Sequence, residues 1–219
     1  MRLLAAFAAG LALGGPALAQ SAAPQSVCSG NAEGAMGERV SVVIQLTQQG
    51  ETVATSASWD PPLAAGSAKA SPEDSYPSLT INYPAPRVAG PGQPDGALVL
   101  VMAFAPPGSR RHANPARQLD GLALAASSDG GAAVVLPLRA EPAVADLPMT
   151  AARFASLPAP PAGTRLITLR LTDRQHRQRA TARYDMSQTA SRDALYGAAW
   201  AEAEQAALHR QSCELTGAE

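Results

Sequence analysis

Six arginines gather in one short stretch near the C-terminal end of the sequence, and their side chains are suited to binding a ligand. They are Arg165, Arg170, Arg174, Arg177, Arg179 and Arg183. A single acid, Asp173, falls within the same stretch. The guanidinium group donates hydrogen bonds in a planar fork that matches phosphate and carboxylate groups. The stretch is therefore a candidate anion-binding site for a lipid headgroup, a polysaccharide or a nucleic acid.

Apolar residues alternate with these arginines. Ile167, Leu169, Leu171, Ala182 and Tyr184 recur at every second position, which predicts two strands of a hairpin with arginines on the polar side. The alternative is an exposed edge hairpin whose charges only keep neighbouring sheets from pairing with it. The sequence leaves both interpretations open.

Histidines and candidate nucleophiles show no arrangement typical of catalysis. His112, His176 and His209 are scattered, and none stands in a Gly-x-Ser-x-Gly or His-Glu-x-x-His motif. Lys69 is the only lysine, and it lies too close to Ser67 for a Ser-x-x-Lys motif. We therefore expect a non-catalytic binding or structural domain, with an enzyme of an unrecognised type as a further alternative.

The sequence also lacks a recognisable pattern for a metal or a cofactor. Its two cysteines and three histidines have no zinc-ligand spacing, and no acidic calcium loop is present. Residues 30–37 are rich in glycine, but no Gly-Lys-Ser/Thr motif accompanies them. We expect neither a bound metal nor a cofactor.

The two cysteines, Cys28 and Cys213, stand near opposite ends of the chain. Neither belongs to a Cys-x-x-Cys pair or lies near a histidine that could activate it. In an oxidising compartment two thiols usually form one bridge. We expect an intrachain disulfide between them, in preference to an intermolecular bridge or a reactive thiol.

The first residues have the three parts of a cleavable export signal. Arg2 supplies the charge, an apolar run over residues 3–13 is followed by Gly-Gly-Pro, and an Ala-Leu-Ala cleavage site ends at Ala19. The run is shorter than the roughly 20 residues that span a bilayer. We expect a mature chain of residues 20–219, without a transmembrane segment, in the periplasm or outside the cell.

The composition indicates one domain without a strong charge. The chain has 219 residues and a formal net charge of −1, so global charge favours neither a nucleic-acid binder nor an enzyme for acidic substrates. About 200 residues after cleavage are typical of one domain. Its many arginines and alanines and single lysine indicate a GC-rich bacterial genome, and together with the export signal this predicts a protein of the bacterial cell envelope. Its partner is unknown from sequence, with another envelope protein or an anionic surface as candidates.

Alternating apolar residues predict a mostly β fold. Strands are expected over 40–47, 53–59, 79–83, 97–104, 119–125, 133–139, 165–172 and 179–186, with proline-rich loops between them. Residues 147–157 fit either a short helix or a strand. The fold class that follows is an antiparallel β-sandwich with one C-terminal amphipathic α-helix packed on it.

The helix is expected at about 190–211, with Thr189 or Ser191 as a cap at its start. Its inner face would carry Tyr196, Ala199 and the buried ring of Trp200. The alanines on this face would allow a close approach to a sheet.

Residues 44–60 and 169–185 resemble each other at a constant offset. Leu46, Thr47, Ala57 and Asp60 recur as identical residues, and Trp59 corresponds to Tyr184. The pattern is compatible with a duplicated hairpin, but we favour two unrelated amphipathic hairpins of similar composition.

Overall fold

The computed structural model describes residues 26–70, 76–84, 90–104, 118–140, 150–209 and 213–215. The predicted export signal and His112 lie outside these residues. Thirteen strands within them form two antiparallel sheets. The strands are β1 (Ser26–Glu33), β2 (Arg39–Leu46), β3 (Thr52–Asp60), β4 (Ala68–Lys69), β5 (Ser78–Pro84), β6 (Gly96–Phe104), β7 (Ala123–Ser128), β8 (Val134–Leu136), β9 (Arg139–Ala140), β10 (Thr150–Leu157), β11 (Leu166–Thr172), β12 (Gln178–Asp185) and β13 (Glu214–Leu215).

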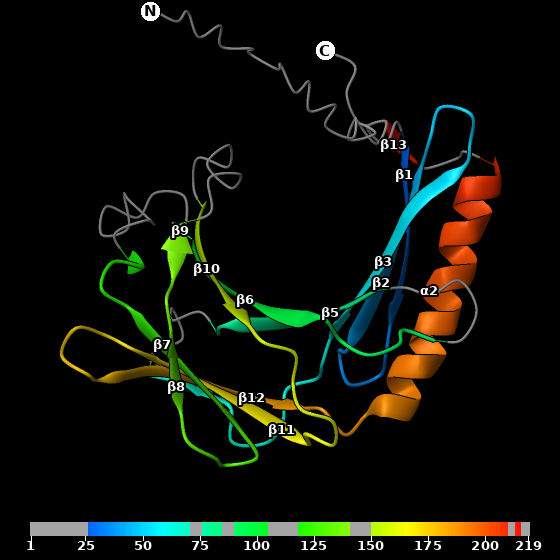
Figure 1. The fold of residues 1–219 in the computed structure, drawn as a ribbon. Coiled ribbons are helices and arrows are strands. Elements are labelled where there is room, and N and C mark those ends of the chain that lie inside the picture. The colour runs from blue at the N-terminus through cyan, green and yellow to red at the C-terminus, as the bar shows by residue number, and fades with distance from the viewer. Residues whose placement is uncertain are drawn as a thin grey trace, which may run out of the picture.

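The expected fold class is confirmed. The larger sheet has the order β13-β1-β2-β3-β5-β6-β10-β9, the smaller sheet has the order β4-β12-β11-β7-β8, and helix α2 (Thr189–His209) comes last among the long elements. The helix lies along β1 and β2 at one end of the larger sheet, and the smaller sheet packs below β5, β6 and β10 (Figure 1). The segment whose sequence fitted either helix or strand is strand β10.

One face of the larger sheet carries the core from β2 to β6. Val40, Trp59, Ile81 and Ala97 are paired across four neighbouring strands, and all are buried. Residues that pair directly across strands lie on the same face. Helix residues and residues of the smaller sheet belong to the same buried cluster. Helix and smaller sheet therefore share one face of the larger sheet and lie side by side on it.

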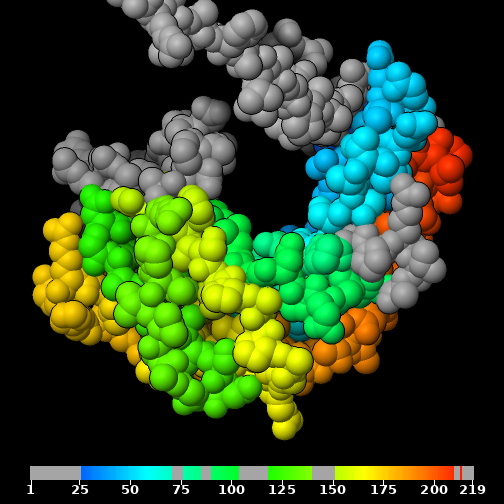
Figure 2. Space-filling model, viewed as in Figure 1, coloured from blue at the N-terminus to red at the C-terminus, as the bar shows by residue number. Residues whose placement is uncertain are grey.

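The other face of the larger sheet is polar over β1, β2, β3 and β5. Asn31, Ser41, Ser58 and Asn82 are paired in one row across these strands, and the Ser41 hydroxyl donates to Asn31 Oδ1 at 2.6 Å. The sheet curls toward this face, so the molecule is hollowed between the β2–β3 hairpin and the strands of the sandwich (Figure 2). Polar side chains here are consistent with a face that no described layer of the fold covers.

Helix α2 approaches β1 very closely because small residues meet. Ala199 and Ala203 are fully buried, and a Cβ atom at Gly30 would collide with the backbone of both alanines. The Glu202 carboxylate accepts a hydrogen bond from the Asn31 amide at 2.7 Å and holds the two elements in register.

The expected inner face of α2 is only partly correct. Tyr196, Ala199 and Ala203 are buried, but Trp200 is only partly buried. The close contact over β1 and β2 leaves the ring of Trp200 on the side of the helix that faces β3, where no described layer covers it. Our expectation of a buried Trp200 was therefore wrong. At the start of the helix, Ser191 donates to the Glu38 carboxylate.

The predicted disulfide between Cys28 and Cys213 is present. It joins β1 to the segment that follows α2, and β13 pairs with β1 immediately beside it. Among the described residues no helix is long and apolar enough to cross a membrane.

The two similar segments of the sequence form antiparallel hairpins in different sheets. Residues 44–60 belong to β2 and β3, and residues 169–185 belong to β11 and β12. Each hairpin has one irregularity in its register near the turn. Trp59 and Tyr184 are both buried. The two hairpins are similar in structure, and their origin by duplication stays a hypothesis.

Candidate functional site

The arginine-rich stretch forms the β11–β12 hairpin of the smaller sheet. Strand β11 is the middle strand, because β12 pairs with one side of it and β7 with the other. Ile167, Leu169 and Leu171 face the core, as their alternation predicted. Arg170 lies on the opposite, outer face of this middle strand. The interpretation of the hairpin as an edge is therefore wrong for β11, and its arginine has no strand edge to protect.

Two arginines and two threonines form a square on the outer face of the smaller sheet. Arg170 pairs with Thr181, and Thr168 pairs with Arg183. Directly opposed side chains on one face lie about 4.5–5.5 Å apart at Cβ, and diagonal neighbours remain within reach of long side chains. The two guanidinium groups therefore belong to one small area, with a hydroxyl beside each.

This area is the wall of a shallow hollow of about 430 Å³. Backbone and side chains from three strands and from the turn after β7 surround it. The residues are Ser127, Gly130, Gly131, Ala133, Leu166, Thr168, Arg170, Thr181 and Arg183. None of the described residues that line it is acidic. The lining combines two cations with three hydroxyl groups, which is a donor set for an anion.

The two arginines of the hollow differ in how they are held. Arg183 donates from Nη1 to the Ala65 carbonyl at 3.0 Å, and its side chain lies against Gly66. Its orientation is therefore fixed by the loop before β4. Arg170 is exposed and makes neither a hydrogen bond nor an ion pair within the described part of the chain. A guanidinium group without an internal partner is available to a ligand.

Two acids near the hollow already accept hydrogen bonds from neighbouring residues. Asp129 accepts hydrogen bonds from the Arg165 and Leu166 amides at 3.0 and 2.9 Å. Hydrogen bonds from Gln188 and Ser187 hold the pKa of Asp185 below its ordinary value. Both carboxylates stabilise turns, and neither lines the hollow.

The structure does not bring all six candidate arginines together. Arg174 and Arg177 lie in the turn between the strands, where Arg177 forms an ion pair with Asp173 at 2.8 Å. Arg165 precedes β11 at the opposite end of the hairpin and is exposed. Arg179 is on β12 next to the register irregularity. Only Arg170 and Arg183 line the hollow, so the candidate site is smaller than the sequence suggested.

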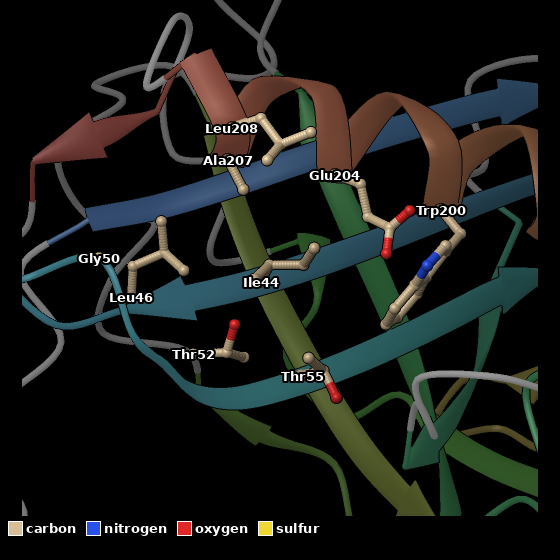
Figure 3. Close-up of a pocket in the computed structure, with 9 residues that line it drawn as sticks. All are labelled: Ile44, Leu46, Gly50, Thr52, Thr55, Trp200, Glu204, Ala207 and Leu208. Carbon is tan, nitrogen blue, oxygen red and sulfur yellow. The ribbon is translucent and has the colours of Figure 1, made fainter.

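A second concave site lies between α2 and the β2–β3 hairpin (Figure 3), and it was missed from the sequence. It has a volume of about 370 Å³. Its lining consists of Ile44, Leu46, Gly50, Thr52, Thr55, Trp200, Glu204, Ala207 and Leu208. The signal in the sequence was a pair of threonines on the inner side of β3, opposite the apolar side chains of β2.

No constellation typical of catalysis occurs in the part of the chain that the structure describes. His176 is in the exposed turn between β11 and β12 with a φ of 58°, and His209 ends α2. Within the described ranges no three His, Cys, Asp or Glu residues lie close enough together to hold a metal ion. Comparisons with protein-family models, with curated proteins and with solved structures found no match to this chain.

Proposed function

We propose that this chain is an exported, non-catalytic binding domain of a bacterial envelope, which binds an anionic group on the outer face of its smaller sheet. Arg170 and Arg183 bind the anion, and Thr168, Thr181 and Ser127 donate hydroxyl hydrogen bonds to it. The ligand class is a phosphate, sulfate or carboxylate group carried by an envelope polymer or a lipid headgroup.

The observation that carries the proposal is the guanidinium group of Arg170, which lies in the middle of a sheet and has no hydrogen bond or ion pair with any residue that the structure describes. It lies diagonally across the strands from Arg183, so two like charges occupy one small area without a lining carboxylate between them. Like charges at this diagonal spacing also repel each other, although less strongly than a directly opposed pair would. A bound anion would remove this repulsion and satisfy both groups, since charge-assisted hydrogen bonds are the strong ones.

Export is supported by two independent observations. The sequence begins with a signal of the cleavable type, and the Cys28–Cys213 disulfide is typical of oxidising compartments. N-terminal sequencing of the protein recovered from the periplasm tests this step. A chain that begins at Gln20 supports it, and a chain that retains residues 1–19 contradicts it.

The binding proposal is tested by retention on heparin and on vesicles that contain anionic lipid, both at low salt. We expect the parent protein to bind at least one of them and to elute as salt rises, because each neutralised anionic group releases counterions. Arg170→Gln should lower the affinity about tenfold or more, the usual range for one lost charge-assisted hydrogen bond.

Arg174→Gln is the matched control, because it removes the same charge from the same hairpin but outside the hollow. It should leave retention close to that of the parent protein. If the parent passes through both matrices at low salt, the proposed function is wrong. Equal losses for both variants would show that retention depends on charge in general and not on the hollow.

A further inference from the structure

The groove between α2 and the β2–β3 hairpin has an apolar floor and one charged side chain. Ile44 and Leu46 form the floor, and they are nearly inaccessible to solvent. Trp200 and Ala207 come from the helix above them (Figure 3). Glu204 is the one charged residue among the described residues that line the groove.

The helix leaves this strip of the sheet open because of where its small residues are. Gly30 draws α2 down onto β1 and β2, and the smaller sheet covers β5 and β6 instead. Among the described residues, therefore, no helix or sheet covers the inner face of β3 near the turn. Thr52 and Thr55 lie on the open part of this face, whereas Ala57 and Trp59 lie on its covered part and are buried.

Large apolar side chains remain accessible to solvent at the edge of the groove. Leu208 is 74% exposed at its edge, and Trp200, only partly buried, stands at its side. A large aromatic ring and exposed leucine beside a concave surface are typical features of a binding site for an apolar group. The volume of about 370 Å³ lies within the range of small-molecule pockets.

The charge in the groove selects the kind of ligand. The Glu204 carboxylate points from the helix into the groove beside the Trp200 ring (Figure 3), and it has no hydrogen bond or ion pair with any described residue. A cation placed there would meet a carboxylate and an aromatic face together.

We propose that the groove binds a small organic cation: an alkyl or aryl ammonium compound whose apolar body packs against Trp200 and Leu208, above the floor of Ile44 and Leu46, and whose charged nitrogen lies between Glu204 and Trp200. The hydroxyl groups of Thr52 and Thr55 form the polar side of the groove, opposite the helix. This site is separate from the anion-binding hollow, since no residue lines both.

The test is a titration of the ¹⁵N-labelled mature protein, followed through the indole N–H signal of Trp200. The chain has two tryptophans, and Trp200→Phe assigns the two signals. The probes are n-hexylammonium, neutral n-hexanol and hexanoate, which share one apolar body and differ in charge. We expect n-hexylammonium to shift the Trp200 signal and to bind at least about fivefold more tightly than n-hexanol.

Glu204→Gln should remove this preference, so that n-hexylammonium and n-hexanol bind within about twofold of each other. Glu202→Gln is the control, because it makes the same charge change on the same helix but on a residue that bonds to β1. It should leave the preference intact. Equal binding of all three probes to the parent protein, no shift of Trp200, or equal effects of the two substitutions would overturn the proposal.

Discussion

Arginine side chains can fix a loop or bind a ligand, and the β11–β12 hairpin contains both kinds. Arg177 is bound to Asp173 through Nε at 2.8 Å and stabilises the turn. Arg183 is held by the Ala65 carbonyl, while Arg170 has no such restraint in the described structure. The sequence alone does not distinguish these arginines from one another, because a hydrogen-bond partner such as the Ala65 carbonyl lies more than 100 positions away.

Glu38 shows how a buried charge can join two elements. It is 2% exposed, and its carboxylate accepts hydrogen bonds from Ser191 Oγ at 2.6 Å and from the Met36 amide at 2.9 Å. The bond from Ser191 lowers the pKa of Glu38 below its ordinary value of 4.5, against an opposing effect of desolvation. The ionised carboxylate therefore fastens the β1–β2 turn to the start of α2.

We predict that Glu38 makes the stability of the protein sensitive to acid. Because folding lowers the pKa of Glu38, its contribution to stability is fully present above about pH 4.5, the pKa of the unfolded chain. The contribution is lost as the pH falls through the lower pKa of the folded protein. Glu38→Gln should destabilise the protein at pH 7 by about 1–3 kcal/mol and should lose less stability than the parent on acidification. Urea unfolding at neutral and acidic pH measures both effects.

Glu51→Gln, on the exposed β2–β3 turn, is the control for the change in charge. It should leave the unfolding free energy at pH 7 nearly unchanged, as exposed charges contribute little. Parallel acid curves for the parent and Glu38→Gln would refute the role given to this carboxylate.

At the scale of elements, the position of α2 depends on the absence of a side chain at Gly30. Substitution by alanine would bring its Cβ to 2.6 Å from the Ala203 amide nitrogen and into the Ala199 carbonyl oxygen. Both atoms belong to the helix backbone, so the helix as a whole would have to move. Gly30→Ala should therefore destabilise the protein by about 1–3 kcal/mol or more, measured by urea unfolding.

Gly197→Ala is the matched control, because Gly197 is an exposed residue of α2 where a Cβ would meet nothing within 4 Å. It should stabilise the protein by up to about 1 kcal/mol, because alanine is the better helix former. A neutral Gly30→Ala variant would show that the helix can adapt its distance to the sheet.

The elements themselves were predictable to different degrees. Strong alternation predicted β2, β5 and β12, and small inner residues predicted the close approach of α2. Strand β1 was missed, because its inner face carries Cys28 and Gly30 in place of large apolar residues. The predicted strand over 133–139 is divided into β8 and β9, which belong to different sheets. The alternation of residues within one segment does not show which sheet each part of the segment joins.

For the whole molecule, the disulfide closes a loop of 185 residues between the first strand and the end of the helix. In the chain-entropy model such a loop contributes at most about 5 kcal/mol. The Cys28→Ala/Cys213→Ala double variant should lose up to this amount in the free energy of unfolding, measured by urea titration. Hydrogen exchange should increase first in β13 and the last turn of α2. Uniform change across both sheets would contradict the local effect.

The layered arrangement could not be predicted from the sequence. Alternation indicated two packed sheets and a helix, but not that helix and smaller sheet lie side by side on one face. That arrangement depends on contacts between segments far apart in the sequence, such as those of α2 with β1 and β2. It creates the open strip beside Trp200 and leaves the outer face of the smaller sheet, with Arg170, accessible.

The central claim is that an anion binds in the hollow of the smaller sheet, and a chemical-shift map of the ¹⁵N-labelled mature protein tests it most directly. Pyrophosphate is the probe, added at low salt with chloride as the control anion. We predict that the largest shifts fall on Thr168, Arg170, Thr181, Arg183 and the Gly130–Gly131 turn, and that Arg170→Gln abolishes them. Largest shifts at the Asp173–Arg177 turn, or small shifts spread over all arginines, would contradict the account.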